Sequence, residues 1–193
     1  GEMHARKIAA LYDMAMKMGA PVIGFVDCSG IRLQEATDAL HALGSMQYKK
    51  VMASGVIPQI TAVFGNCGGG LAADAALTDF VFMAQTGKMF VNSPNTISGN
   101  SKDKCDSSNA GFQSEKNGFI DMVGTEGEVI EQIRALVAVL PANNKDHDSY
   151  EVGADDLNRL CKEIESRAED PAELLAMIAD EYFFFETKRN YAK

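Results

Sequence analysis

Two short apolar runs, each followed at once by a glycine turn, constrain the fold of this chain more than any other feature. The first run covers residues 22–27 and continues into Cys28-Ser29-Gly30. The second covers residues 57–64 and continues into a segment with four glycines in six positions, residues 65–70. Apolar runs of this length are typical of strands buried on both faces in a parallel sheet. Ligands of such α/β folds bind at the carboxyl ends of the strands, so both turns are candidate sites.

Helical periodicity separates these two runs. Residues 5–18 carry apolar side chains at helical spacing, and Gly19 ends the predicted helix. The side chains expected on its inner face are Ile8, Leu11, Tyr12, Ala15 and Met18. A second helix is expected to run to about Ala53 with three side chains facing inward: Leu40, Leu43 and Val51. Helices between buried strands favour an α/β layer fold with largely parallel pairing.

The rest of the chain adds shorter elements. Three more strands are expected at residues 79–84, 89–92 and 119–123. Residues 98–117 are polar and aperiodic, and we interpret them as a mobile or functional loop. Two helix starts carry capping signals. They are Thr125-Glu-Gly-Glu128, before a helix that Pro141 ends, and Asp170-Pro-Ala-Glu173, before an acidic helix expected to end in Phe183-Phe-Phe185.

Charge and cysteine content narrow the functional classes. The 193 residues carry a formal net charge of −9, which argues against a nucleic-acid surface but leaves room for a small anionic ligand. No apolar run approaches the ~18–20 residues of a membrane span. Four separated cysteines and three unclustered histidines offer no metal-ligand spacing, so no metal site is expected. A reducing cytoplasm is the expected compartment.

The glycine segment 65–70 is the strongest candidate for chemistry. Each glycine costs roughly 0.5–1 kcal/mol relative to alanine, which suggests that the backbone does something a side chain would obstruct. One interpretation is that its N–H groups approach negative charge on a ligand. The other is a tight turn between a strand and a helix. Arg32, on the first turn, is either a phosphate or carboxylate contact or a salt-bridge partner of Glu35 or Asp27.

The same segment supports a rival hypothesis. Gly65-x-Cys67-x-Gly69 matches the nucleophile-elbow pattern with cysteine in the serine position, as in thiol hydrolases and amidases. A thiol nucleophile needs a histidine base. The elbow order places that histidine after the nucleophile, where only His147 stands, in a polar linker. A buried, inert Cys67 is the simpler interpretation.

Three segments together resemble the motifs of biotin-dependent carboxyltransferases. Asp27-Cys-Ser-Gly-Ile-Arg-Leu-Gln-Glu35 resembles the family's D-S-G-G-A-R-I-Q-E. Ala53-Ser-Gly-Val-Ile-Pro-Gln-Ile60 with Gly65-Asn-Cys-Gly-Gly-Gly70 resembles A-S-G-V-I-P-Q-I … G-P-C-A-G-G, and Ala76-Leu-Thr-Asp-Phe80 resembles A-L-T-D-F. Ser29 stands where the family motif has Gly, and Gly68 stands where it has Ala. The likeness covers most of residues 1–141, and residues 155–193 resemble connecting helices of the acyl-CoA decarboxylase branch.

The resemblance implies a crotonase-like fold built from ββα units and a reaction on acyl-CoA thioesters. A carboxyl group would move between carboxybiotin, carried on a partner protein or domain, and the α-carbon of the acyl group. The thioester enolate on this path needs N–H donors rather than a dedicated base. The family match assigns these donors to Gly69 and Gly70, partnered by Gly30 and Ile31 of the other turn. It assigns substrate binding to three neighbouring residues: Arg32, Gly68 and Ser29.

The resemblance also implies a domain organisation and a set of partners. Residues 1–141 would form an amino-terminal carboxyltransferase domain shortened at its start, and residues 142–193 a linker and helices leading to an absent second domain. The expected partners are acyl-CoA, a biotin carboxyl carrier, a second carboxyltransferase domain or subunit, and further copies in a homo-oligomer. The expected location is the cytoplasm or the periphery of a membrane decarboxylase complex. The chain alone is expected to be weak or inactive, and a non-catalytic half that serves only in assembly remains an alternative.

Overall fold

The computed structural model describes residues 1–103, 105–146, 156, 158–167, 169–180, 184–189 and 191. It divides into two compact units, one formed by Gly1–His147 with Thr187–Lys193 and the other by Asp148–Glu186. The first unit holds the sheet, and the second holds helix α7 (Pro171–Ile178). The domain boundary expected after residue 141 stays a prediction.

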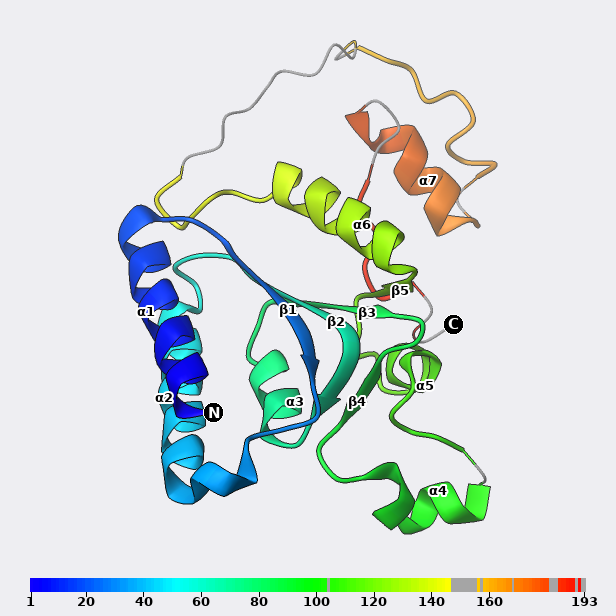
Figure 1. Cartoon of the computed structure of the whole chain (residues 1–193). Coiled ribbons are helices and arrows are strands. Elements are labelled where there is room, and N and C mark those ends of the chain that lie inside the picture. Colours follow the sequence, from blue (N-terminus) through cyan, green and yellow to red (C-terminus); the bar gives the residue numbers. More distant parts are fainter. Residues whose placement is uncertain are drawn as a thin grey trace. The chain divides into compact units, whose positions relative to one another are not determined.

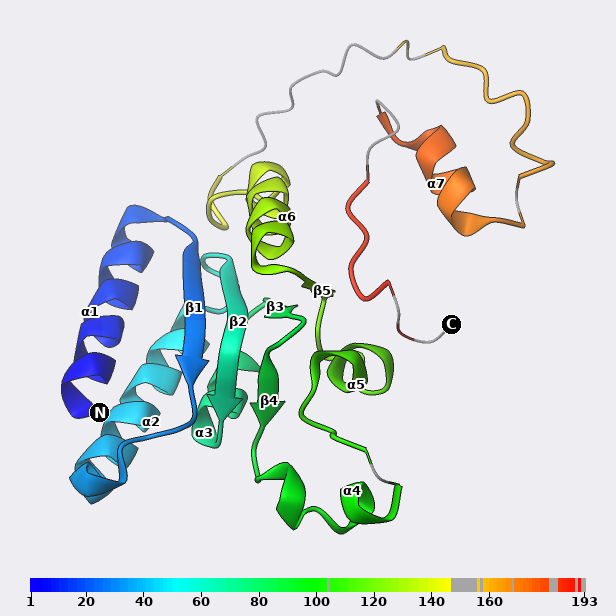
Figure 2. The same cartoon turned by 45° about the vertical axis from the view of Figure 1, so that its right-hand side comes forward.

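A five-stranded sheet forms the centre of the first unit (Figure 1, Figure 2). Its strands are β1 (Val22–Cys28), β2 (Gln59–Gly68), β3 (Phe80–Ala84), β4 (Lys88–Phe90) and β5 (Met122–Gly124). The strand order is β1-β2-β3-β5, and β4 pairs with the last residues of β2. The four strand pairs of this sheet are all parallel, which confirms the predicted parallel α/β layer.

Strand β2 is longer than the sequence indicated, which corrects the interpretation of the glycine segment as a turn. Residues 65–68 continue the strand: Cys67 pairs with Cys28 of β1, and residues 66–68 pair with residues 88–90 of β4. The chain turns only at Gly69, whose φ of 62° and ψ of −133° favour glycine. Glycine is needed earlier in the segment because neighbouring groups come close, as a Cβ at Gly65 would overlap the Asp27 carboxylate.

Helices α1 (Glu2–Met18) and α2 (Ala36–Ala53) lie side by side next to β1 and β2 (Figure 1, Figure 2). The predicted end of α1 is confirmed, because Gly19 adopts a left-handed φ of 66° and its N–H bonds to the Ala15 carbonyl. A 3-10 turn (Leu33–Glu35) leads into α2. Tyr12 and Ala15 of α1 share a core with three residues from β1, the end of α2 and the start of the next segment: Val22, Ala53 and Ile57.

The inner faces of both helices differ from the prediction. Four of the residues expected there are exposed: Leu11, Met18, Leu40 and Val51. The buried positions of α2 go mostly to small side chains and include a lysine: Ala39, Ala42, Leu43, Met46, Lys50 and Ala53. Small side chains let the helices and the sheet approach closely, so tertiary packing overrides the apolar pattern here.

Strand β1 is buried on one face only, whereas the sequence predicted burial on both. Ile23 and Phe25 are 40% and 60% exposed, while Val22 is buried. Alternate residues of a strand point to opposite faces, so this pattern marks one face that the described residues leave open. The physical reason is that the helices beside β1, α1 and α2, cover one face of this edge strand (Figure 1). Phe25 packs on Phe64 of β2, with ring centroids 5.3 Å apart.

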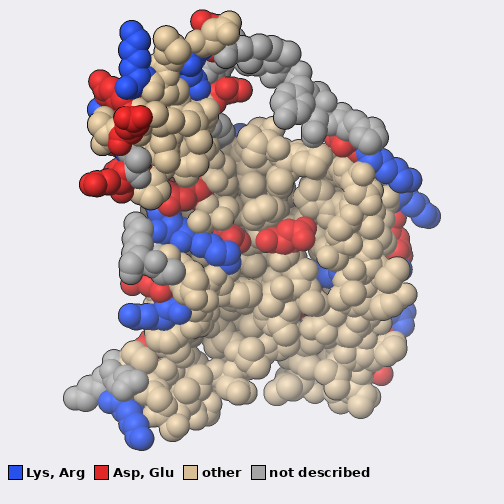
Figure 3. Space-filling view, turned by 180° about the vertical axis from the view of Figure 1, so that it is seen from behind, with Lys and Arg blue, Asp and Glu red and all other residues tan. Residues whose placement is uncertain are grey.

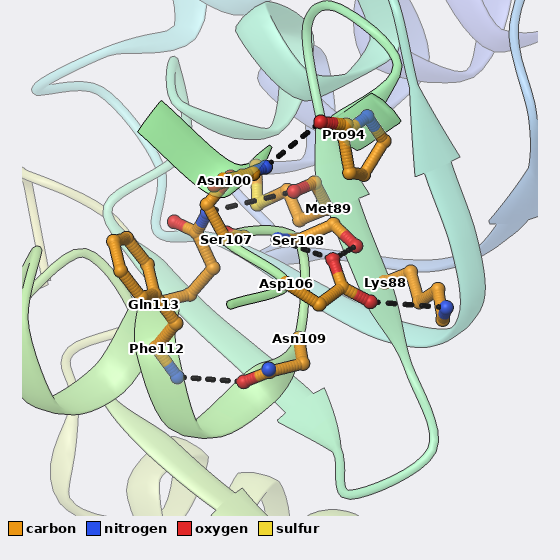
Figure 4. A network of polar contacts seen from close by, with 10 residues as sticks. All are labelled: Lys88, Met89, Pro94, Asn100, Asp106, Ser107, Ser108, Asn109, Phe112 and Gln113. Atoms are coloured by element: carbon orange, nitrogen blue, oxygen red, sulfur yellow. Dashed lines mark hydrogen bonds and ion pairs between the residues drawn. The ribbon is translucent and has the colours of Figure 1, made fainter. Parts of the chain in front are cut away.

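Residues 98–117 contain regular structure, which corrects their interpretation as a loop. After a 3-10 turn (Pro94–Thr96) they form helices α4 (Ser98–Asp103) and α5 (Ala110–Glu115). Between the helices, Asp106 Oδ1 accepts from the Ser108 N–H at 3.0 Å, and Asn109 caps α5 by accepting from Phe112 N–H at 2.8 Å (Figure 4). Short polar helices held by side-chain bonds leave no apolar period in the sequence.

Both capping predictions are confirmed. Helix α6 (Glu126–Val139) begins with a complete capping box between Thr125 and Glu128. In the second unit, Asp170 accepts from two backbone N–H groups at the start of α7. This helix ends at Ile178, so the predicted end in Phe183-Phe-Phe185 is wrong; Phe184 and Phe185 are not helical, and Phe183 lies outside the described residues. No helix in the described part of the chain is both long and apolar enough to cross a membrane.

Charged side chains are unevenly spread on the face seen from behind. In Figure 3 the lower half of the view is formed mostly by uncharged residues, with charged side chains of both signs at its margins.

Candidate functional site

The two glycine turns meet at the carboxyl ends of β1 and β2. A Cβ at Gly68 would lie 2.3 Å from the Ser29 carbonyl oxygen, and a Cβ at Gly30 would lie 3.7 Å from the Gly68 carbonyl oxygen. Asp27 links the strands just before the turns, since its Oδ1 accepts from the Asn66 N–H at 2.9 Å. The fold therefore brings Ser29, Gly30 and Gly68 into direct contact.

Backbone hydrogen bonds distinguish the two adjacent glycines of the second turn. The Gly69 N–H donates to the Phe90 carbonyl oxygen at 2.8 Å, so this amide is committed to β4, whereas the sequence predicted a free donor. The N–H groups of Gly70 and Leu71, at the start of α3 (Gly70–Ala75), have no acceptor among the described residues. Of the two donors predicted for this turn, Gly69 and Gly70, only Gly70 therefore has an available amide in the described part of the chain.

The first turn presents unpaired amides as well. Gly30 has a φ of 146°, a value that favours glycine, and its carbonyl accepts from the Cys28 thiol at 3.2 Å. The N–H groups of Gly30 and Ile31 have no acceptor in the described part of the chain. Both residues line a cavity of about 280 Å³ that extends between β1 and helices α1 and α2. Available amides thus stand on both of the touching turns.

Arg32 makes the salt bridge that was one of its two expected roles. Its Nη1 lies 3.3 Å from Glu35 Oε1, and its side chain is 66% exposed. Asp27, the other expected partner, is bound to Asn66 instead. An exposed ion pair contributes only about 0–1 kcal/mol, so little stability would be lost if the guanidinium turned to an anionic ligand.

A polar pocket of about 530 Å³ adjoins Phe90, the residue that holds the Gly69 amide. Its lining includes Asn66, Lys88, Phe90, Asn95, Asn100 and Asp106. Lys88 Nζ lies 3.2 Å from Asp106 Oδ2, and Asn100 Nδ2 donates to the Pro94 carbonyl at 3.0 Å (Figure 4). The Ser108 hydroxyl, bonded to Asp106, holds the pKa of that carboxyl below its usual value. Part of its lining lies in residues 98–117, which the sequence analysis marked as a mobile or functional loop without predicting a pocket.

A buried ion pair next to the glycine turn was also missed. Lys50 Nζ of α2 lies 2.6 Å from Asp74 Oδ2 of α3, and the two side chains are 8% and 7% exposed. Asp74 Oδ1 has no partner among the described residues. Burial raises the pKa of the Asp74 carboxyl above its usual value, and Lys50 opposes that rise. The sequence did carry a signal that Lys50 is buried, because Lys50 follows Leu43 and Met46 at helical spacing on the buried face of α2.

Cys67 has the wrong surroundings for the nucleophile of the rival hypothesis. It lies inside β2 with 0% exposure, rather than at a sharp, accessible turn. Burial, with Asp74 nearby, raises the pKa of its thiol to about 12, so the thiolate is scarce near neutral pH. The proposed base, His147, lies outside the described residues. The structure thus does not favour the thiol-hydrolase alternative, and the buried, inert thiol that the sequence also indicated is the better description.

Known proteins match the whole chain. It is 35% identical over 205 residues to the methylmalonyl-CoA decarboxylase subunit alpha of Propionigenium modestum and 33% identical over 204 residues to the propionyl-CoA carboxylase beta chain of Roseobacter denitrificans. All of this chain is covered in both cases, with 40% of each relative. The chain therefore spans about two fifths of the length of these relatives.

A solved structure agrees over the same length. Transcarboxylase 12S, described as a hexamer with hydrolysed methylmalonyl-coenzyme A bound, superposes with a TM-score of 0.87 and 29% identity over all of this chain and 39% of its own. The solved neighbours are carboxyltransferases of the crotonase fold, which confirms the predicted crotonase-like α/β fold. A family model described as "Carboxyl transferase domain" matches residues 1–193. The chain belongs to the carboxyl transferase domain family.

Proposed function

We propose that this chain is the carboxyltransferase component of a biotin-dependent acyl-CoA carboxylase or decarboxylase. A carboxyl group would move between carboxybiotin and the α-carbon of an acyl-CoA through a thioester enolate. The observation that carries this function is the contact of two glycine turns that leaves the N–H groups of Gly70, Gly30 and Ile31 without acceptors in the described chain. The names of the relatives, a decarboxylase and a carboxylase of acyl-CoA, support the same chemistry.

Unpaired backbone amides suit an enolate because they donate hydrogen bonds from fixed positions. The thioester oxygen gains negative charge when the α-carbon loses its carboxyl group or its proton, and donors already in place stabilise that charge. In other oxyanion holes, the loss of one donor costs about 2.7–4 kcal/mol. The proposed donors are Gly70 on one turn and Gly30 with Ile31 on the other. Gly69 would hold its turn in shape through the bond to Phe90.

The residues around these donors are proposed to bind the substrate. Ser29 and Gly68 make the tight contact between the turns, so they would set the width of the acyl site. Arg32 is exposed beside them and would meet an anionic part of the CoA. A dedicated base is not required in the decarboxylating direction, because loss of carbon dioxide itself leaves the enolate.

The polar pocket fits the ureido head of biotin. Two side-chain amides that line it, those of Asn66 and Asn95, have no partner among the described residues. Each amide offers a donor and an acceptor, which complement the carbonyl and N–H groups of a ureido ring. Bound biotin supplies the carboxyl group in one direction and receives it in the other. Asn66 and Asn95 would hold and orient its ring.

The proposed partners follow from this chemistry. They are an acyl-CoA, a biotin carboxyl carrier, and a second carboxyltransferase domain or subunit. Transcarboxylase 12S is described as a hexamer, which supports a homo-oligomer for this chain. All four cysteines are free, as in proteins of reducing compartments, and we propose the cytoplasm or the periphery of a membrane decarboxylase complex as the location.

Gly70→Val in the assembled enzyme tests the function. An added Cβ meets only the tip of the Leu43 side chain, so a β-branched residue is expected to cover the amide without breaking the fold. We expect carboxyl transfer to fall by about 100-fold or more, with little change in the melting temperature. Gly127→Val is the matched control, because Gly127 also lies in the first turn of a helix and an added Cβ there meets nothing within 4 Å.

Unchanged transfer by Gly70→Val would contradict the proposed function. Calorimetry of the unsubstituted protein gives a second test. A stable oligomer that binds no acyl-CoA would favour the purely assembling role instead.

A further inference from the structure

Side chains on one face of α2, here called the stripe of α2, contact both the start and the end of α3. Leu43, Gln47 and Lys50 are spaced four and three residues apart, so they share one helix face. Leu43 packs against Gly70, since its Cδ2 lies 2.5 Å from the place where a Cβ of Gly70 would be. Gln47 Nε2 donates to the Gly70 carbonyl oxygen at 3.3 Å. The first residue of α3 is therefore held by two side chains of α2.

Lys50 holds the other end of α3. Its Nζ pairs with Asp74 Oδ2 at 2.6 Å and also donates to the Asp74 backbone carbonyl at 3.3 Å. The backbone of Lys50 is itself tied to the sheet, because its carbonyl accepts from Gln59 Nε2 of β2 at 3.0 Å. The lysine thus connects α2, the start of β2 and α3 in one buried set of polar contacts.

Helix α3 depends on these contacts for its orientation. It has six residues, and a helix this short is unstable by itself. Directly before α3 the chain is fixed at Gly69, whose amide bonds to Phe90 of β4. The direction of the Gly70 N–H is therefore set between two anchors, the bond at Gly69 and the stripe of α2.

We propose that Gln47 and Lys50, with Asp74, are positioning residues for carboxyl transfer: they aim the Gly70 amide at the substrate oxygen through α3. This role rests on the proposed function of Gly70. Buried ion pairs are costly to form and are often replaceable by apolar residues without loss of stability, so stability alone is a weak reason for this one. Lys50 and Asp74 also line the cavity beside Gly30 and Ile31, but in this scheme all three residues act through α3.

Two variants of different severity test the role in the assembled enzyme. Gln47→Met removes the bond to the Gly70 carbonyl at a half-buried position, and Lys50→Met removes the ion pair while it keeps the aliphatic stem. We expect kcat to fall about 10-fold and about 100-fold, with the KM for acyl-CoA changed less than about threefold, because misplacement of a catalytic group by about 1 Å can cost that much. Hydrogen exchange of the peptide covering residues 69–76 is expected to become faster in both.

Lys49→Met is the matched control. Lys49 is the adjacent residue of α2 and pairs with Asp13 of α1 at 2.6 Å, so the substitution removes a lysine–aspartate pair that does not reach α3. Its kcat and its exchange over residues 69–76 are expected to match those of the unsubstituted enzyme. The double variant Lys50→Gln with Asp74→Asn restores a neutral hydrogen-bonded pair, and we expect it to recover most of the kcat lost in Lys50→Met.

Each outcome decides a different point. Unchanged exchange over residues 69–76 in both variants would overturn the positioning role even if activity falls. Faster exchange with unchanged kcat would overturn the link to catalysis, and Gly70→Val then shows whether the proposed function itself fails. A loss of melting temperature in Lys50→Met with normal kcat in the folded fraction would leave the ion pair a purely structural element and would also overturn the proposal.

Discussion

Gly68→Ala should force the two glycine turns apart. The added Cβ would lie 2.3 Å from the carbonyl oxygen and 2.8 Å from the carbonyl carbon of Ser29, and 3.0 Å from Phe90 Cε2. The nearest atoms belong to the backbone, so no flexible side-chain end can move aside. Opening the shortest contact to an ordinary distance requires a relative shift of about 1 Å, a degree of overpacking that typically costs about 1–3 kcal/mol.

The same shift should reduce activity, because the proposed donors Gly70 and Gly30 would be displaced relative to one another. A misplacement of about 1 Å can cost roughly 100-fold in rate. We expect kcat for carboxyl transfer to fall by that order and the melting temperature to fall by roughly 2–4 °C per kcal/mol lost. Gly44→Ala is the control, since an added Cβ at that position of α2 meets nothing within 4 Å, and alanine should stabilise a helix interior.

A second substitution makes this prediction sharper. The family motifs have Gly at the position of Ser29 and Ala at the position of Gly68. Glycine at position 29 allows the backbone to turn its carbonyl away, so Ser29→Gly combined with Gly68→Ala should regain most of the lost stability and activity. The reasoning is refuted if Gly68→Ala melts and turns over like the unsubstituted protein, or if the double variant is no better than the single one.

Three further outcomes test other parts of the structure. Iodoacetamide near pH 8 should label the exposed Cys28 and spare the buried Cys67, as read by mass spectrometry, and labelling of Cys67 in the folded protein would contradict its raised pKa. Thr125→Ala should cost about 1 kcal/mol in denaturant unfolding. Hydrogen bonds from the Thr125 N–H and from its hydroxyl hold the pKa of Glu128 below its usual value. Thr125→Ala removes only the hydroxyl bond, whose contribution is present at neutral pH and is lost as the pH falls through that lowered pKa, so a penalty that grows in acid would be the wrong sign. Arg32→Ala should leave unfolding within ~0.5 kcal/mol but raise the KM for acyl-CoA, and an unchanged KM would remove Arg32 from the binding site.

The sequence was sufficient for features that depend on neighbouring residues. The capping box at Thr125, the cap at Asp170 and the left-handed end of α1 at Gly19 were all predicted, because each is made within a few residues of chain. The parallel α/β layer was also predicted, since buried strands joined by helices allow few other arrangements. The motif resemblance added the crotonase-like fold.

Features that depend on distant residues needed the tertiary structure. Leucines at helical spacing predicted the wrong inner face of α2, because alanines and Lys50 made the close contacts. The sequence of residues 65–70 did not show that residues 65–68 continue the strand, that Gly69 forms the turn, and that the Gly70 amide stays available. That division is fixed by β4, whose Phe90 accepts from Gly69, and by α2, which holds Gly70. Hydrogen-bond partners far apart in sequence decide which backbone amide stays available, and local pattern carries no information about them.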